Sequence, residues 1–251
     1  MLAVPYAQWF LLAFYRISMT ILITRANEHA YATQKDVEAR GFATLIDPML
    51  DIEQLANPAP ISPTIAAFII TSRNALQGFK TIAQKNIPLF IVGKETAELF
   101  KQAGFANIHG IAEQGSELPA LIKTTIPAGN LLHITSQHAH TDFYDALLDA
   151  GYGIEQRLVY IAHAARAFQP ETLKALQNKQ LTGVLFYSAR TAQIFSGLIA
   201  QQSLAESLRT ITAYCLSDAI ADALHKQQWK HVVVAKSPTH VALIDCLAKA
   251  A

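Results

Sequence analysis

Short apolar runs bounded by turn-forming residues alternate with helical patterns along almost the whole sequence. This alternation is typical of βα units whose strands form a parallel sheet. It therefore predicts an α/β fold. Two other extended segments, 43–53 and 152–162, precede no helical pattern of their own, and we expect them to cross between domains. The predicted strands are 21–24, 66–71, 89–92, 107–111, 131–135, 184–187, 212–216 and 231–235.

An internal repeat divides these units into two sets. TSRNALQGF at 71–79 and YSARTAQIF at 187–195 share Ser, Gln and Phe at equal spacing, and VGKETAE at 92–98 corresponds to LSDAIAD at 216–222. The unit that begins with LLHITS at 131 has no partner near the C-terminus. Its counterpart is the N-terminal unit, which begins with ILITR at 21. The repeat predicts two similar domains, and chance similarity between βα units is the alternative.

The N-terminal unit is thus expected to complete the C-terminal domain. Domain one is predicted to be discontinuous, 19–42 plus 164–251, and domain two to span 56–151. Segments 43–55 and 152–163 are the predicted crossing strands. Two such crossings favour a hinge. We expect two flavodoxin-like parallel-sheet domains that face each other across a ligand cleft.

The composition limits the kinds of molecule that we expect the chain to bind. The chain has 251 residues, 51% of them hydrophobic, which is enough for two small cores. Its 20 Lys and Arg against 19 Asp and Glu provide no broad basic field for nucleic acid or anionic membrane. Cys215 and Cys246 have no Cys or His cluster around them, which favours reduced thiols in the cytoplasm.

Residues 1–18 form an apolar extension of uncertain role. The extension lacks a basic start and a small-residue cleavage site, and it is shorter than the ~20 residues of a spanning helix. We expect no stable membrane insertion. An upstream start codon and an amphipathic membrane or partner anchor are the two interpretations.

Ligands of open parallel sheets bind outside the carboxyl ends of the strands, where helix N-termini offer free N–H groups to anions. Small polar residues occupy these positions in both repeats. Ordinary helix capping explains any one of them as well as ligand contact does. The candidate binding residues are Thr24, Arg25, Thr71, Ser72, Arg73, Asn74, Gly93, Lys94, Thr96, Ser188, Ala189, Arg190, Ser217 and Asp218.

Tyr160 is the candidate catalytic residue. It lies in the second crossing, where a phenol could donate a proton to a leaving oxygen. A tyrosine chosen for strand packing is the alternative. The sequence contains no GxGxxG, P-loop, nucleophile elbow or HExxH motif, and the pair His138 and His140 has no third ligand nearby. The other histidines show no usable spacing, so we expect neither cofactor nor metal.

The motifs taken together resemble the uroporphyrinogen-III synthase family over about residues 19–250. They are ILITR, TSRNAL, VGKETAELFKQAGF, a Gly-Tyr turn leading to VY, FYSARTAQIF, CLSDAIADAL and AKSPTHVALI. The resemblance implies two α/β domains joined by a two-stranded ladder. It also implies cyclisation of hydroxymethylbilane, a linear tetrapyrrole, with loss of water and inversion of the last ring. Tyr160 would then help the hydroxyl to leave, while Thr96, Ser72, Asn74 and Ser188 match family motif positions.

Two departures from the family pattern bear on the site. Thr135-Ser136 stands where members often carry Arg-Gly, and Ser217 with Ile220-Ala221 stands where many carry Gly with Thr-Ala. The resemblance implies a monomeric, cytoplasmic, cofactor-free lyase of tetrapyrrole and heme biosynthesis. The alternatives are a two-domain module that binds or senses a small acidic ligand and an inactive homologue of the synthase.

Overall fold

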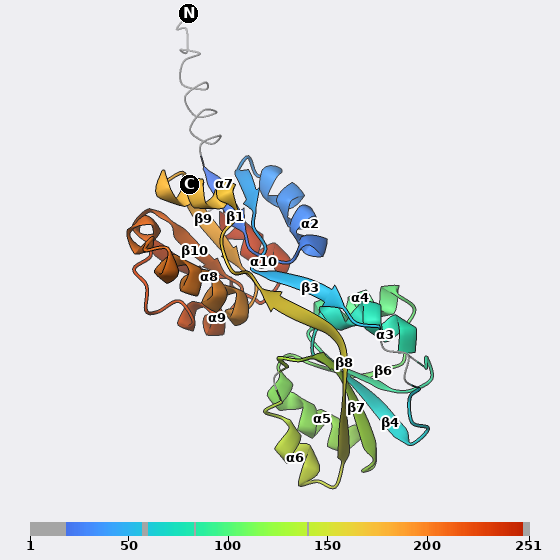
Figure 1. Cartoon of the computed structure of the whole chain (residues 1–251). Helices are drawn as coiled ribbons and strands as arrows, with labels where there is room; N and C mark the ends of the chain where they lie inside the picture. Colours follow the sequence, from blue (N-terminus) through green and yellow to red (C-terminus); the bar gives the residue numbers. More distant parts are fainter. Residues whose placement is uncertain (1–18, 57–59, 83, 140, 248–251) are drawn as a thin grey trace, which may run out of the picture. The chain divides into compact units, whose positions relative to one another are not determined.

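The structure is a computed structural model that describes residues 19–56, 60–82, 84–139 and 141–247 (Figure 1). Its strands are β1 (Thr20–Ile23), β2 (Ala43–Ile46), β3 (Leu50–Gln54), β4 (Ile65–Ile70), β5 (Leu89–Val92), β6 (Ile108–Ala112), β7 (Asn130–Ser136), β8 (Gly153–Ala164), β9 (Leu181–Phe186), β10 (Thr212–Cys215) and β11 (His231–Val234). Each predicted strand is present, with ends that differ by a few residues. The prediction of an α/β fold with parallel sheets is confirmed.

Helices follow most of the strands. The α-helices are α2 (Asn27–Glu38), α3 (Leu76–Ile82), α4 (Lys94–Gln102), α5 (Leu118–Thr125), α6 (Tyr144–Leu148), α7 (Pro170–Gln177), α8 (Ala189–Gln201), α9 (Asp218–Asp222) and α10 (His240–Asp245). Short 3₁₀ helices are η1 (Arg73–Ala75), η2 (Gly115–Glu117) and η3 (Ala205–Thr210). The segment 152–162 was expected to lead into no helix, but α7 follows β8 after a short loop.

The chain divides into two compact units. Unit 1 consists of two segments, the described residues up to Asp51 and the described residues from Ala164 onward. Unit 2 is the segment between them, Ile52–His163. Strand order in the unit 1 sheet is β2-β1-β9-β10-β11, and in the unit 2 sheet it is β3-β8-β7-β4-β5-β6. Without β3, the two orders correspond strand for strand. This correspondence confirms the repeat seen in the sequence, in which β1 is the counterpart of β7 and β9 is the counterpart of β4.

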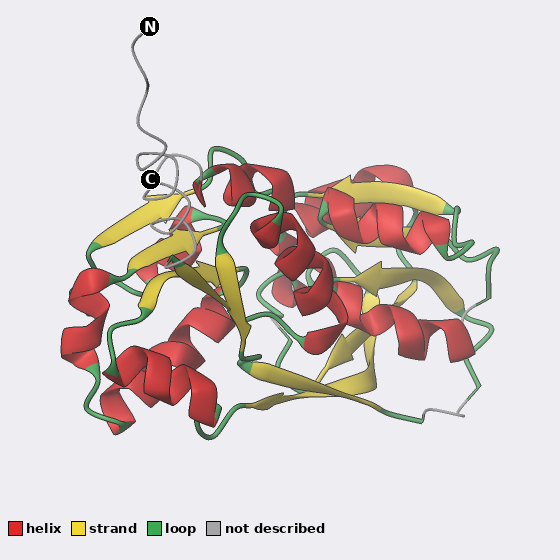
Figure 2. Ribbon diagram, turned by 90° about the horizontal axis from the view of Figure 1, so that it is seen from above, coloured by secondary structure: helices red, strands yellow, loops and turns green. Residues whose placement is uncertain are grey.

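The unit 1 order is the flavodoxin-like order 2-1-3-4-5. Its sheet is buried on both faces because alternate residues of each strand point to opposite sides. In β1, Leu22 packs in one core cluster with residues of α7, α8 and α9, whereas Ile21 and Ile23 pack in another with residues of α2 and α10. Figure 2 shows the same layering, with helices on either side of the strands.

Unit 2 has the same construction. Ala67, Ile69 and Phe90 pack against α5 and α6 on one face of its sheet. On the other face, the ring of Phe68 in β4 contacts Phe79 in α3 edge-on, with ring centroids 5.1 Å apart. Burial on both faces accounts for the nearly continuous apolar runs in the sequence.

The prediction that 43–55 forms one crossing strand is wrong. The segment forms two strands, because Ala43–Ile46 pairs in parallel with β1 inside the unit 1 sheet, whereas β3 lies beside β8 in the other sheet. Between them, the Asp47 carboxylate accepts a hydrogen bond of 2.9 Å from the Gln169 backbone N–H. Burial raises the pKa of Asp47. Unit 1 therefore continues to Asp51, beyond the predicted end of its first segment at residue 42.

Candidate active site

Each sheet has one position where the strand order reverses. In unit 1 it lies between β1 and β9, and in unit 2 between β4 and β7. Neighbouring loops lead away in opposite directions at such a position, which leaves a crevice outside the carboxyl ends of the strands. Several candidate residues lie directly after these strands, so the topology of each unit brings them to a favourable place for ligand binding.

Thr24 and Arg25 follow β1. Thr24 is fully buried, and its hydroxyl donates to the Leu185 carbonyl in β9 over 2.7 Å, so its side chain joins the two strands at the reversal. Arg25 is half-buried, and its Nη1 donates to the Thr33 hydroxyl in α2. Its Cζ lies 3.9 Å from the centroid of the Tyr187 ring, which follows β9. The guanidinium is thus held beside the carboxyl ends of β1 and β9, where the strand order of unit 1 reverses.

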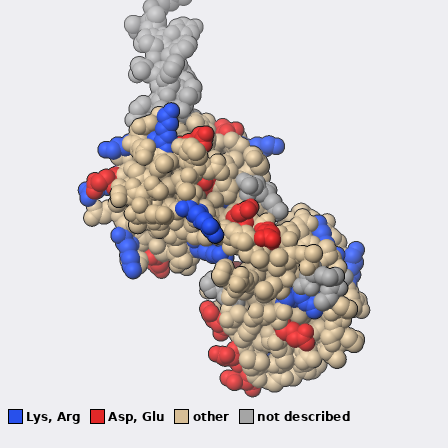
Figure 3. Space-filling view, viewed as in Figure 1, with Lys and Arg blue, Asp and Glu red and all other residues tan. Residues whose placement is uncertain are grey.

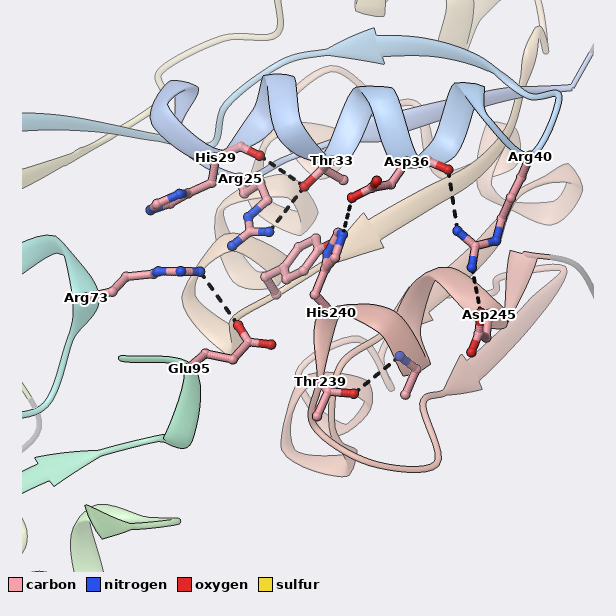
Figure 4. Close-up of polar contacts among 12 residues, drawn as sticks. Arg25, His29, Thr33, Asp36, Arg40, Arg73, Glu95, Thr239, His240 and Asp245 are labelled. Atoms are coloured by element: carbon pink, nitrogen blue, oxygen red, sulfur yellow. Dashed lines mark hydrogen bonds and ion pairs between the residues drawn. The ribbon is translucent and has the colours of Figure 1, made fainter. Parts of the chain in front are cut away.

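Tyr187 belongs to a chain of side chains from three elements. Its Oη lies 2.7 Å from Nδ1 of His240, the first residue of α10. The Nε2 of His240 lies 2.8 Å from Oδ2 of Asp36 in α2. Figure 4 shows His240 pointing to Asp36 and the Arg25 side chain beside Thr33. These contacts fix the orientation of the Tyr187 ring, which carries Arg25 on its face.

Two of the three candidate serines cap helices with their side chains. Ser188 accepts a hydrogen bond from the Thr191 N–H at 3.1 Å, and Ser72 accepts one from the Asn74 N–H at 3.2 Å. The capping interpretation is therefore confirmed for both serines. Ser217 is the N-cap residue of α9 but makes no side-chain cap bond. Four further candidates lie in the helical segments after these serines. Ala189 and Arg190 are the first two residues of α8, Asp218 is the first residue of α9, and Asn74 is the middle residue of η1.

A cavity of about 270 Å³ lies in unit 2 at the carboxyl ends of its strands. Its lining comprises Thr71, Val92, Gln114, Gly115, Ser116, Asp142 and Phe143. The Thr71 hydroxyl lies 2.9 Å from Nε2 of His133, a fully buried residue of β7. On the other side of the imidazole, Nδ1 lies 2.6 Å from the hydroxyl of Tyr144. Thr71 is therefore the one predicted binding residue that lines this cavity.

Arg73 follows Thr71 in the loop after β4. Its Nη1 lies 3.7 Å from Oε2 of Glu95, as Figure 4 shows. Its Nε is buried and has no hydrogen-bond partner within the described structure. A buried donor without a partner costs free energy, about 1–3 kcal/mol. Because the Arg73 side chain as a whole is 28% exposed, a ligand would meet other atoms of the guanidinium than this buried nitrogen.

Three more candidates lie at the start of α4. Gly93 is the N-cap residue and has φ of 88°, a conformation that favours glycine. Lys94 is exposed, with its Nζ 3.4 Å from Oε1 of Glu113. Thr96 is half-buried in the first turn. These residues present polar groups beside the carboxyl end of β5.

Tyr160 lies in β8, where its partner in the register is Ser136 at the end of β7. This places the Tyr160 backbone next to the carboxyl end of a switch-point strand. Its side chain is only 5% exposed. That burial is compatible with the packing role as well as with a proton donor reached by a ligand.

Among the residues that the structure describes, no cluster of three His, Cys, Asp or Glu could hold a metal ion. His138 is described, whereas His140, its partner in the HAH pair, lies outside the described residues, as do residues 1–18. Within the described chain, no helix is both long enough and apolar enough to span a membrane.

Sequence reasoning missed the buried histidine of β7 and the pair formed by His240 and Asp36. The spacing of these residues carried no signal because their partners come from remote parts of the chain; His240 and Asp36 are 204 residues apart. A usable signal for His133 was present, however. A histidine inside the apolar run LLHIT must be buried, and a buried imidazole needs hydrogen-bond partners.

The fold and these sites define a class: an α/β protein made of two flavodoxin-like units, each with polar groups at its switch point. Comparison with known families specifies the class further. The model of the family described as uroporphyrinogen-III synthase HemD matches residues 31–245. The chain therefore belongs to the uroporphyrinogen-III synthase family, whose members are lyases of tetrapyrrole biosynthesis.

Solved structures agree on the fold. A uroporphyrinogen-III synthetase from Helicobacter pylori is 19% identical, with a TM-score of 0.61 and coverage of 93% of this chain and all of that one. A mutant uroporphyrinogen III synthase from Thermus thermophilus is 17% identical, with a TM-score of 0.60 and coverage of 92% and 98%. No curated protein gave a significant match.

Proposed function

We propose that this chain cyclises hydroxymethylbilane to uroporphyrinogen III, with loss of water and inversion of the last ring. The family match over 31–245 is the observation that carries this function. It favours neither a ligand-binding module nor an inactive homologue. The substrate is a linear tetrapyrrole with an acetate and a propionate on every ring, so a protein that closes it must control both its shape and its charge.

The reaction needs geometry more than a strong nucleophile. Loss of the hydroxyl leaves an azafulvene cation, and the substituted carbon of the last ring must attack it to give a spiro intermediate. That intermediate reopens and closes with the ring inverted. Without guidance, the unsubstituted carbon attacks and the symmetric isomer forms. Holding the reacting ends in the productive orientation can by itself account for several kcal/mol of a barrier, roughly 7–11 in favourable cases.

The positions of two arginines at the switch points support this proposal. Arg25 in unit 1 and Arg73 in unit 2 each follow the first switch-point strand of their sheet. The Arg73 side chain is 28% exposed, so part of its guanidinium is open to a substrate carboxylate. We assign Arg25 and Arg73 to carboxylate binding, with Thr71, Asn74, Lys94 and Thr96 as further polar contacts. We assign the buried Thr24 to joining β1 and β9 through its hydrogen bond to the Leu185 carbonyl.

We assign most of the remaining candidates to shaping the loops and helix starts around the site. Ser72, Ser188 and Ser217 occupy N-cap positions. Ala189, Arg190 and Asp218 open the helices after Ser188 and Ser217, where backbone N–H groups could donate to a substrate carboxylate. Gly93 allows the turn before α4. Tyr160 is proposed to donate a hydrogen bond to the departing hydroxyl, with strand packing as the competing role.

We further propose a monomer in the cytoplasm that binds no nucleic acid. The formal net charge is +1. On the face drawn in Figure 3, basic and acidic side chains of unit 1 are interspersed. Nucleic-acid binding proteins instead gather positive charge on one face.

A product assay tests the proposed function. Purified protein is given hydroxymethylbilane, and the products are oxidised and separated by isomer. We expect the type III isomer to replace the symmetric type I isomer, which forms spontaneously. A product ratio equal to that of a protein-free blank would contradict the synthase function.

A further inference from the structure

A row of hydrogen-bonded side chains runs through the interior of unit 2 to its cavity. Tyr144 in α6, His133 in β7 and Thr71 after β4 form this row, with contacts of 2.6 and 2.9 Å at the two imidazole nitrogens. His133 is fully buried. Burial also lowers its pKa to about 4, so the imidazole is neutral at physiological pH. A neutral imidazole carries one proton, so one nitrogen donates and the other accepts.

The hydrogen bonds around Tyr144 select the direction of the row. Burial raises the pKa of Tyr144 to about 12, while a hydrogen bond with the Gln156 side chain opposes that rise. A phenol O–H is a stronger acid than an imidazole N–H, and an imidazole nitrogen is a stronger base than a phenol oxygen, so the 2.6 Å contact between Tyr144 and His133 favours the phenol as the donor. The phenol proton then goes to Nδ1 of His133. Consequently, Nε2 carries the imidazole proton and donates it to the Thr71 hydroxyl oxygen.

This direction leaves the Thr71 proton free for the cavity. The hydroxyl oxygen accepts from His133, so its own O–H can donate to an acceptor in the space that Thr71 lines. Successive donors in such a row polarise one another in the same sense, which strengthens the last one. An acceptor oxygen, and a carboxylate above all, is the ligand group that fits this donor.

We infer that His133 is a positioning residue, which presents the Thr71 hydroxyl as a hydrogen-bond donor to a carboxylate arm of the substrate in the unit 2 cavity. The inference rests on the proposed function. It assigns no proton transfer to His133, which stays neutral and does not touch the substrate. The carboxylate would bind near Thr71 and away from Asp142, an exposed acid that also lines the cavity.

The tautomer can be measured without any substrate. Histidine labelled with ¹⁵N distinguishes a protonated Nε2 from a protonated Nδ1, and the His133→Gln variant assigns the signal by its loss. We expect protonation at Nε2 in the intact chain. Protonation at Nδ1 would overturn the inference while leaving the proposed function untouched.

A double-mutant cycle tests whether His133 acts through Thr71. Thr71→Val and His133→Leu are each expected to raise KM about tenfold with kcat nearly unchanged, the loss of one hydrogen bond to a charged group. The double variant should be no worse than either single one. If His133→Leu instead causes a general packing defect, it raises KM further even when Thr71 is already valine. Additive losses would therefore show that His133 does not act through Thr71.

Two further variants separate positioning from packing. His133→Gln offers an N–H to Thr71 and an oxygen to Tyr144, so it should recover most of the affinity lost in His133→Leu. Asp142→Asn should lower KM two- to threefold, because it removes a like charge from the carboxylate's surroundings. A KM that is unchanged or higher in Asp142→Asn would contradict a carboxylate in this cavity. If the intact chain forms no type III isomer, the proposed function fails instead, and the tautomer result still stands.

Discussion

The guanidinium of Arg25 lies over the face of the Tyr187 ring, with Cζ 3.9 Å from the ring centroid. The tyrosine is held in turn by His240, which contacts Asp36 through its other nitrogen. Three elements of unit 1 are thereby linked at the position where its strand order reverses. The geometry holds a long, adaptable cation in one place, which reduces the entropy it loses on meeting a carboxylate.

Substitution of Tyr187 separates the ring from the hydroxyl. Tyr187→Phe keeps the ring under Arg25 and loses the contact of the hydroxyl with His240, so we expect a KM within about twofold and a loss of about 1 kcal/mol in the free energy of unfolding. Tyr187→Leu also removes the cation–π contact, and a several-fold rise in KM should follow. Urea unfolding and steady-state kinetics check both. Equal KM values in the two variants would exclude a role for the ring in holding Arg25.

Salt should weaken substrate binding if arginines hold carboxylates. We expect KM to rise with ionic strength in the intact protein and to rise less steeply in Arg25→Gln and Arg73→Gln, because each variant removes a screened ionic contact. The matched control is Lys101→Gln, at the C-terminal end of α4, where Lys101 pairs with Glu98 at 2.7 Å. KM values measured across a salt series decide the matter. The same salt dependence in all four proteins would argue against carboxylate binding by these arginines.

The stability of the protein should depend on His133 in mildly acidic solution. The unfolded imidazole takes up a proton near pH 6.5, and the buried one only near pH 4. The unfolded state thus binds more protons between these values, so the free energy of unfolding falls as the pH is lowered from 6.5 to 4, by about 3 kcal/mol in total. Below pH 4 the imidazole is protonated in both states, so His133 lowers the free energy of unfolding no further.

Urea unfolding of the intact chain and of His133→Gln over this pH range isolates the contribution. Asp47 acts in the opposite sense, since its raised pKa makes the folded state bind more protons above pH 3.8. Both proteins contain Asp47, so it cancels in their difference. A difference that does not change between pH 7 and 4.5 would contradict the depressed pKa of His133.

Tyr160→Phe tests the proposed hydrogen bond to the leaving hydroxyl. We expect kcat to fall about ten- to a hundredfold with KM little changed, because the bond forms chiefly as the hydroxyl departs. The unfolding free energy should change by less than about 1 kcal/mol, since the ring remains. Tyr152→Phe is a matched control, as its hydroxyl donates to the Ile126 carbonyl inside unit 2. If kcat survives in Tyr160→Phe, the tyrosine has only a packing role.

The strands could be predicted from sequence because burial on both faces makes each one a short apolar run between turn residues. The boundary at 43–55 could not, since an isolated extended segment does not reveal which neighbour it pairs with. Pairing with β1 assigned Ala43–Ile46 to unit 1. The loops after the strands were predicted as polar sites by topology alone. Their hydrogen-bond partners, such as His240 for Tyr187, depend on tertiary contacts that no local spacing encodes.

The insertion of unit 2 between β2 and β9 has a consequence for synthesis on the ribosome. Every residue of unit 2 emerges before β9, β10 and β11, whereas β1 and β2 emerge first and have no β9 to pair with. Unit 2 can therefore complete its sheet while unit 1 is still half made. During that interval β1 lacks β9, its partner in the finished sheet, so its apolar side chains stay exposed until the C-terminal strands are made.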